Sequence, residues 1–257
     1  MNKIIAHFVF LMVAAVVFSA TQLHAGLAIT PARSEVNMVP GTSCSGSYTV
    51  RNDYTKDALI EVAFRDWFTL PENEATPLSQ WVSVEPSSFS LKSGESKQVN
   101  YTVHMPTGIT GVSVDMLSFT PSVAEDSGVT MMMSVSLYVT AKGTEKAAWD
   151  VEDIKVTKSP TEFRVSAVVK NSGNVHVRPA GNVAVFTAGN VPVCSMNINE
   201  GRPVYPGASR PISAYYTNVS VLKAGSYTVV LTVDGAGEQK TKKIKFKINK
   251  AGEVNLK

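Results

Sequence analysis

Residues 222–233 read LKAGSYTVVLTV, and this stretch decides the fold of the second half of the chain. Leu222, Gly225 and Tyr227 stand at the offsets of a corner found in immunoglobulin-like sandwiches, where a tyrosine hydroxyl bonds back to the main chain. The apolar residues after the tyrosine then recur at every second position, as in a half-buried strand. The pattern favours such a corner, with an ordinary strand aromatic at Tyr227 as the alternative.

The same period of two runs through almost the whole chain, and turn-forming residues interrupt it at short intervals. In the first half, the expected strands lie near 27–39, 45–52, 58–69, 81–91, 97–105, 112–120 and 129–140. In the second half, they lie near 150–157, 162–170, 182–188, 191–198, 208–217, 226–234 and 241–249. Seven short strands in each half predict an all-β chain of two consecutive immunoglobulin-like β-sandwich domains.

The first 25 residues have the features of a secretory signal peptide. A positive start precedes an apolar run over residues 4–18, which is shorter than the roughly 20 residues of a spanning helix, and a small residue, Ala25, ends the segment. The remaining 232 residues suffice for two domains, which we place at 26–143 and 144–257. No later stretch is apolar enough to cross a bilayer. We therefore expect a periplasmic protein, with a secreted or cell-surface location as the alternative.

The net charge of +3 conceals two halves of opposite sign. Residues 26–145 carry 7 Lys and Arg against 13 Asp and Glu, whereas residues 146–257 carry 16 against 8. Many of the lysines lie in residues 240–250, where they alternate with apolar residues as on the solvent face of a strand. No aromatic platform accompanies them, so we expect no binding to nucleic acid.

The sequence offers no group of residues for catalysis or metal binding. The mature part has two histidines, His104 and His176, one in each half, so a zinc pair at short spacing is missing. Neither a G-x-S-x-G elbow nor a glycine-rich phosphate loop occurs. We expect a binding protein, neither an enzyme nor a protein with a metal or cofactor.

Two cysteines remain in the mature chain, Cys44 and Cys194, and they fall in different predicted domains. An exported protein meets an oxidising compartment, which invites pairing. A lone cysteine among alternating strand residues is more often a small buried apolar group. We therefore expect burial of each cysteine and no disulfide between them.

The seventh strand of the first half is the candidate binding element. Residues 129–140 read VTMMMSVSLYVT, and its odd-numbered residues form an apolar row on one face: Val129, Met131, Met133, Val135, Leu137 and Val139. Methionine adapts to varied apolar surfaces, and an exposed strand edge can add a strand from a partner. The row either binds an extended segment of another protein or faces the core of its own sandwich.

Several short motifs within residues 27–140 accompany this strand. The opening strand, LAITPAR, ends at Arg33, Asn52 ends the second strand, and FSLKSGES occupies residues 89–96. Together with the apolar seventh strand, these motifs resemble the periplasmic pilus chaperones of the chaperone-usher type, which have two immunoglobulin-like domains after a signal peptide. The family's second anchor, a lysine within K-L-F-Y-R-P, has no counterpart, since residues 136–141 read SLYVTA.

The resemblance implies that Arg33 contacts the terminal carboxylate of a subunit. It also implies that the seventh strand is donated to the incomplete fold of that subunit. An ion pair between Arg33 and Glu35 is the alternative for this arginine. The implied partner is a pilin-like exported subunit, with an outer-membrane usher as a further partner. The expected function is a chaperone that assists pilus assembly, and the alternative is a structural or adhesion protein without chaperone activity.

Overall fold

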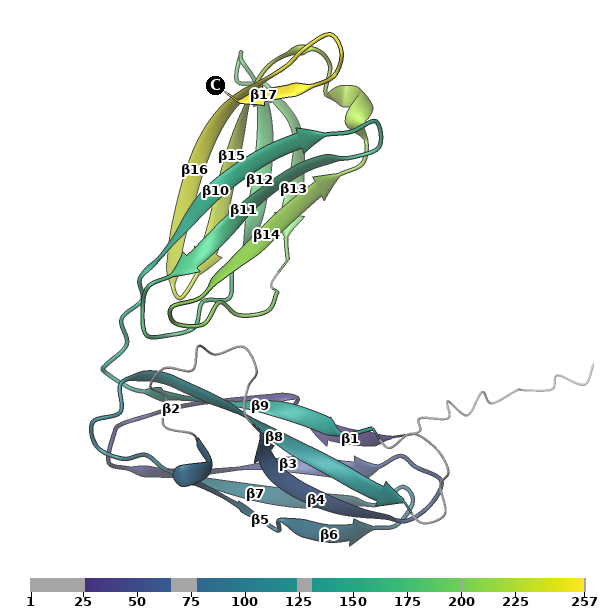
Figure 1. Ribbon diagram of the computed structural model, residues 1–257, viewed down its shortest axis with the longest axis vertical. Coiled ribbons are helices and arrows are strands. Elements are labelled where there is room, and N and C mark those ends of the chain that lie inside the picture. Colours follow the sequence, from purple (N-terminus) through teal and green to yellow (C-terminus); the bar gives the residue numbers. More distant parts are fainter. Residues whose placement is uncertain (1–25, 66–77, 124–130, 200, 257) are drawn as a thin grey trace, which may run out of the picture.

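The computed structural model describes residues 26–65, 78–123, 131–199 and 201–256. These residues form two β-sandwiches that follow one another along the chain, with separate apolar cores (Figure 1). The prediction of two consecutive immunoglobulin-like sandwich domains is confirmed. The expected signal peptide, residues 1–25, lies outside the described residues. No helix in the described part of the chain is long and apolar enough to span a membrane.

The first sandwich packs a four-stranded sheet, in the order β1-β3-β7-β5, against a five-stranded sheet, in the order β2-β9-β8-β4-β6. Its strands are β1 (Leu27–Thr30), β2 (Arg33–Met38), β3 (Ser43–Asn52), β4 (Ala58–Arg65), β5 (Val82–Glu85), β6 (Ser88–Leu91), β7 (Ser96–His104), β8 (Gly111–Val123) and β9 (Met133–Ala141). A single turn of 3-10 helix, η1 (Leu78–Gln80), precedes β5. Alternate residues of both sheets meet in the core, as period-two sequences require.

The first strand of this sandwich changes sheets part of the way along. β1 pairs antiparallel with β3, whereas β2 pairs parallel with β9, from Arg33 beside Ser136 to Met38 beside Ala141. The Thr30–Pro31 peptide bond, which is cis, lies between β1 and β2. Consequently β2 covers the edge of β9 only from Ser136 onward.

The second sandwich packs a three-stranded sheet, β10-β11-β14, against a five-stranded sheet, β13-β12-β15-β16-β17. Its strands are β10 (Trp149–Lys158), β11 (Phe163–Asn171), β12 (Ala180–Thr187), β13 (Pro192–Ile198), β14 (Ser209–Tyr216), β15 (Gly225–Gly235), β16 (Glu238–Ile248) and β17 (Val254–Leu256), with a 3-10 turn η2 (Val219–Val221). The hydroxyl of Tyr227 donates to the carbonyl oxygen of Lys223 at 2.8 Å, so the tyrosine corner is confirmed.

A fully buried asparagine ends an equivalent strand in each sandwich. The amide nitrogen of Asn52, at the end of β3, donates to the carbonyl oxygens of Lys56 at 2.8 Å and Leu91 at 3.1 Å, and its side-chain oxygen accepts from the N–H of Tyr54. Asn171, at the end of β11, makes the same three bonds, with the carbonyls of Val175 and Val204 and the N–H of Gly173. Each amide thus ties its strand end to the next turn and to a second, distant segment.

Both cysteines are free thiols, and their burial differs from the expectation. Cys44, near the start of β3, is exposed, and Cys194 in β13 is half-buried. The expected burial of Cys44 is wrong because the first three residues of β3 are all exposed, and the strand enters the core only farther along.

Candidate functional site

Strand β9 is covered unequally along its length. β8 pairs with it from Met133 to Ala141, but β2 borders its other edge only from Ser136 to Ala141. Within the described residues, the β2-facing edge of β9 from Met133 to Val135 has no strand partner. An unpaired edge presents main-chain donors and acceptors to any chain that approaches it.

The exposure of the apolar row changes between Met133 and Val135, within the same part of the strand. Val135 and Leu137 lie in the core of the first sandwich, with 3% and 0% of their surface exposed. Met131 and Met133 are 53% and 39% exposed, and Met132 between them is 43% exposed. Val129 lies outside the described residues. The later residues of the row therefore fill the core, its methionines face solvent, and partner binding at the methionines stays a prediction.

Arg33 stands at the junction between the open and the covered edge of β9, because it is the first residue of β2 and pairs with Ser136. Its Nε atom lies 3.0 Å from Oε1 of Glu35, and both side chains are about half exposed. The ion pair expected as one alternative is thus present. An exposed pair of this kind contributes little to stability, so Glu35 is not a costly partner to displace.

A second arginine reaches the same carboxylate from the second sandwich. Nε of Arg178 lies 3.8 Å from Oε1 of Glu35, and its guanidinium carbon lies 5.1 Å from the centre of the Tyr138 ring. The Nε and Nη2 atoms of Arg178 are buried and form no hydrogen bond within the described residues. Buried guanidinium donors without hydrogen bonds favour a nearby anion, and Arg33, Glu35 and Arg178 form a charged cluster where the two sandwiches meet.

Aromatic side chains pack next to this charged cluster. Tyr138 lies on the face of β9 opposite the core, and it is buried against Tyr205 of the second sandwich, with 2.9 Å between the hydroxyl oxygens. The His176 ring lies 4.6 Å from the Tyr138 ring, centre to centre. Burial is the main cause that lowers the pKa of His176, helped by the positive charge of Arg178, and burial also raises the pKa of Tyr205.

The connection between the sandwiches is held by Asn174. Its side-chain oxygen accepts from the N–H of Lys146 at 2.6 Å, and its amide nitrogen donates to the carbonyl oxygen of Thr144 at 2.9 Å. Its carbonyl oxygen accepts from the N–H of Val112. A Cβ at Gly111, where φ is +68°, would lie 2.1 Å from the Asn174 carbonyl oxygen, so a larger residue would push the sandwiches apart. These bonds join the second sandwich to the connecting segment and to the start of β8.

Among the described residues, no three histidine, cysteine or acidic side chains gather as a metal site would require. The structure places Met131 and Met133 at the start of β9, Arg33 beside Ser136, and Arg178 farther along the strand, at Tyr138. Sequence reasoning missed Arg178 because its role depends on packing between halves of the chain. The sequence signal nearest to it is the contrast between a negative first half and a positive second half.

No protein-family model matches the chain, and no curated protein matches its sequence. Among solved structures, the Class 5 fimbriae chaperone CfaA has 13% identity and a TM-score of 0.49, covering 90% of this chain and 99% of its own. The YadV chaperone has 11% identity and a TM-score of 0.48, covering 85% and 98%. The complex of the Salmonella enterica SafA pilin with the SafB chaperone gives 12% identity and a TM-score of 0.43, covering 85% and 95%.

Proposed function

We propose that the protein is a periplasmic chaperone-like protein that binds pilin-like exported subunits by β-strand donation and assists their assembly. In this proposal, the open edge of β9 pairs with an extended segment of the subunit. The observation that carries the proposal is that exposed methionines and an unpaired edge occur together at the start of β9, next to Arg33, the first residue of β2. Farther along β9, Arg178 contacts the same carboxylate as Arg33, that of Glu35. An exposed apolar strand edge is a hazard unless a partner uses it. Binding here needs no covalent step.

The geometry gives the bound strand a direction. From Met133 to Ser136 the open edge spans about 10 Å, the length of three residues of extended chain. A partner strand on this edge continues the line of β2, and its end abuts Arg33. If that end is a carboxyl terminus, the partner strand runs parallel to β9, as β2 does. Main-chain bonds then supply affinity, and Met131 and Met133 fill apolar positions of the partner.

The partner carboxylate would take the place of Glu35 between the two arginines. Arg178 thereby serves in place of the lysine that the seventh strand lacks. Charge-assisted bonds from a guanidinium to a carboxylate contribute about 1.5–3 kcal/mol, and the exposure of Arg33 lowers its share. Replacing either arginine by alanine should weaken capture about 5- to 30-fold, which corresponds to about 1–2 kcal/mol.

Photo-crosslinking in the native cell tests the proposal. A photoreactive amino acid replaces Met131 or Met133, and the control position is Leu59, an apolar residue of β4 in the same sandwich with 44% exposure. The expected result is a crosslink to an exported, pilin-like subunit from the methionine positions and not from Leu59. A usher would be captured as a further partner.

Charge substitutions complete the test. Met133→Glu should abolish capture while circular dichroism shows an unchanged fold. The control, Leu59→Glu, should retain both capture and fold. Equal crosslinking from all three positions would contradict strand donation, and so would unfolding of Met133→Glu. Failure to capture any exported subunit would instead favour a structural or adhesion protein built of the same sandwiches.

A further inference from the structure

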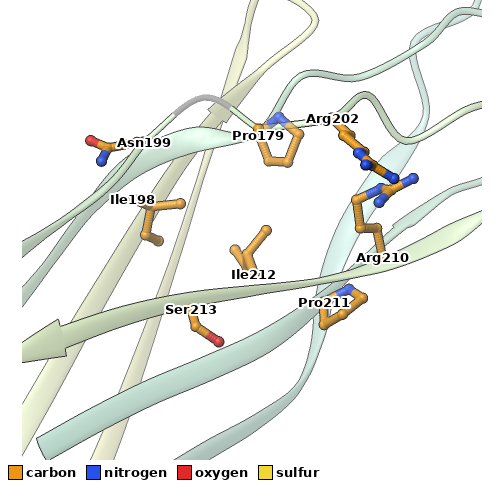
Figure 2. A pocket seen from close by; sticks show the side chains of 9 residues that line it. Pro179, Ile198, Asn199, Arg202, Arg210, Pro211, Ile212 and Ser213 are labelled. Atoms are coloured by element: carbon orange, nitrogen blue, oxygen red, sulfur yellow. The ribbon is translucent and has the colours of Figure 1, made fainter. Parts of the chain in front are cut away.

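The second sandwich contains a pocket of about 260 Å³ whose lining includes no residue of the charged cluster (Figure 2). It opens between β13 and β14, which are edge strands of the two opposing sheets. Its lining comprises Pro179, Ile198, Asn199, Gly201, Arg202, Arg210, Pro211, Ile212 and Ser213. The pocket is smaller than most sites for drug-sized ligands, so it fits one or two amino-acid side chains.

Two arginines meet at one end of this pocket. Figure 2 shows the guanidinium groups of Arg202 and Arg210 turned toward one another. Nε of Arg210 donates to the carbonyl oxygen of Pro203 at 3.2 Å, which holds that side chain in place. Neither arginine forms an ion pair with a described residue, and no described acidic residue lines the pocket. Two adjacent cations repel one another, and a carboxylate between them removes the repulsion.

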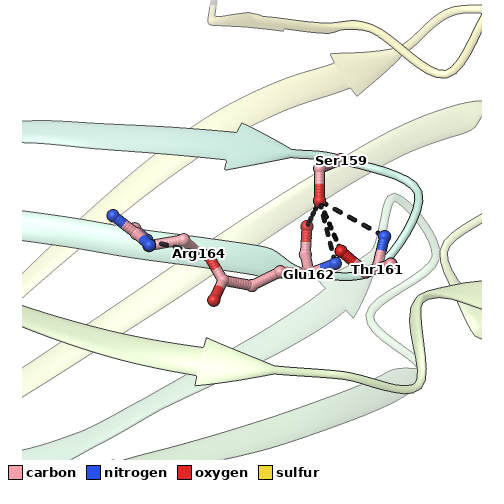
Figure 3. A network of polar contacts seen from close by, with 4 residues as sticks. All are labelled: Ser159, Thr161, Glu162 and Arg164. Carbon is pink, nitrogen blue, oxygen red and sulfur yellow. Dashed lines mark hydrogen bonds and ion pairs between the residues drawn. The ribbon is translucent and has the colours of Figure 1, made fainter.

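Arg164, at the opposite end of the same sandwich, is an arginine with an ion-pair partner and serves as a comparison. Its Nε atom lies 2.9 Å from Oε1 of Glu162, and its guanidinium group stacks 4.7 Å from the ring centre of Tyr215. In Figure 3, Glu162 follows a turn that the Ser159 hydroxyl organises through bonds to Thr161 and Glu162. Arg164 therefore has both an anionic and an aromatic partner, whereas neither pocket arginine has an ion-pair partner among the described residues.

The rest of the pocket is apolar. Ile198 and Ile212 form its floor, with 5% and 9% of their surface exposed, and Pro179 and Pro211 flank them. Pro211 lies within edge strand β14 and has no N–H to donate, which interrupts strand addition at this point. A ligand is thus recognised by its side chains, through one acidic group and one apolar group.

We propose that this pocket is a second binding site, for a peptide segment in which an acidic residue is next to an apolar residue. The acidic side chain lies between Arg202 and Arg210, and the apolar side chain covers Ile198 and Ile212. Two residues of the pocket are close in sequence to residues at the contact between the sandwiches. Pro179 follows Arg178 directly, and Tyr205, which contacts Tyr138, is three residues after Arg202. The site does not depend on strand donation at β9.

Nuclear magnetic resonance tests the site with a blocked tetrapeptide that has leucine and aspartate at its centre. Titration into the labelled mature protein should shift the amide signals of Ile198, Ile212 and Ser213, with a dissociation constant on the order of 1 mM. The matched peptide with asparagine in place of aspartate should bind at least about 5-fold more weakly, because it lacks the charge. The peptide with serine in place of leucine should also bind more weakly.

Variants assign the shifts to the arginine pair. Arg202→Gln and the double variant with Arg210→Gln should lose the binding, while Arg164→Gln should keep it, and signals outside the pocket report the fold. The titrations are repeated in Glu200→Gln, which removes the acidic residue adjacent in sequence as a competitor. Binding that survives in the double variant would overturn the proposal. Equal shifts from acetate would reduce the site to an adventitious ion, and equal binding of octanoate would refute its assignment to peptides.

Discussion

Replacing Asn52 by alanine should destabilise the first sandwich by about 3–5 kcal/mol, because the side chain satisfies three main-chain groups at once. The Leu91 carbonyl is buried and would lose the Asn52 amide as a donor, at a cost of about 1–3 kcal/mol. The carbonyl of Lys56 and the N–H of Tyr54 are nearer the surface, so water compensates for part of their loss. The sum approaches the whole stability of a domain, about 5–15 kcal/mol.

The effect should be visible by differential scanning calorimetry. A loss of about 4 °C per kcal/mol for a sandwich of this size gives a decrease of roughly 12–20 °C in the unfolding temperature of the first sandwich. Hydrogen exchange identifies which sandwich unfolds in each transition. Asn100→Ala, a change on an exposed position of β7, is the control and should shift the transition little.

The matched asparagine of the second sandwich sharpens the test. Asn171→Ala removes the same three bonds and should lower the transition of the second sandwich by a similar amount. Each substitution should act mainly on its own sandwich, because the two cores are separate. A decrease below about 5 °C in both variants would refute the reasoning that these amides are structural ties.

Three further outcomes are expected. Burial lowers the pKa of His176 below 6.5 in the folded protein, so the unfolded chain binds more protons as the pH falls below that value. The free energy of unfolding, measured by urea titration, should therefore decrease between pH 6.5 and pH 5, and His176→Gln should show a smaller decrease. Maleimide at pH 8 should modify exposed Cys44 well before Cys194, since burial raises the pKa of the Cys194 thiol to about 11, and equal rates by mass spectrometry would contradict this. Tyr227→Phe should keep the fold and lose about 1 kcal/mol in urea unfolding, because only the bond to the Lys223 carbonyl is removed.

Period-two patterning predicted most strands close to their observed positions, because burial of one face imposes that period on any sandwich strand. Two of its errors fall at prolines. The strands expected near 27–39 and 81–91 are each divided in two, beside Pro31 and Pro86, which lack the N–H that a continuous ladder uses. Strand β17 was not predicted, since three residues are too few to show a period.

The part of the site that lies between the sandwiches had no signal in the local sequence. Arg178 is 143 positions from Glu35, and its role follows from the contact of Tyr138 with Tyr205. Tyr138 falls on the even-numbered face of β9, which the alternating pattern assigns to solvent. The second sandwich covers that face instead. A pattern of period two reports which face of a strand is buried within its own sandwich, and it carries no information about burial by a neighbouring domain.

The division of β1 from β2 explains why the open edge of β9 exists. An uninterrupted strand over residues 27–39, paired with β9 throughout, would have protected the edge beside Met133 with main-chain bonds. Instead β1 joins the opposite sheet, and β2 begins at Arg33, so the protected part of β9 starts at Ser136. The same switch therefore exposes the edge and places an arginine at its end. In the proposed mechanism, a partner strand occupies the stretch that β1 leaves uncovered, and the boundary at Arg33 sets how far it extends.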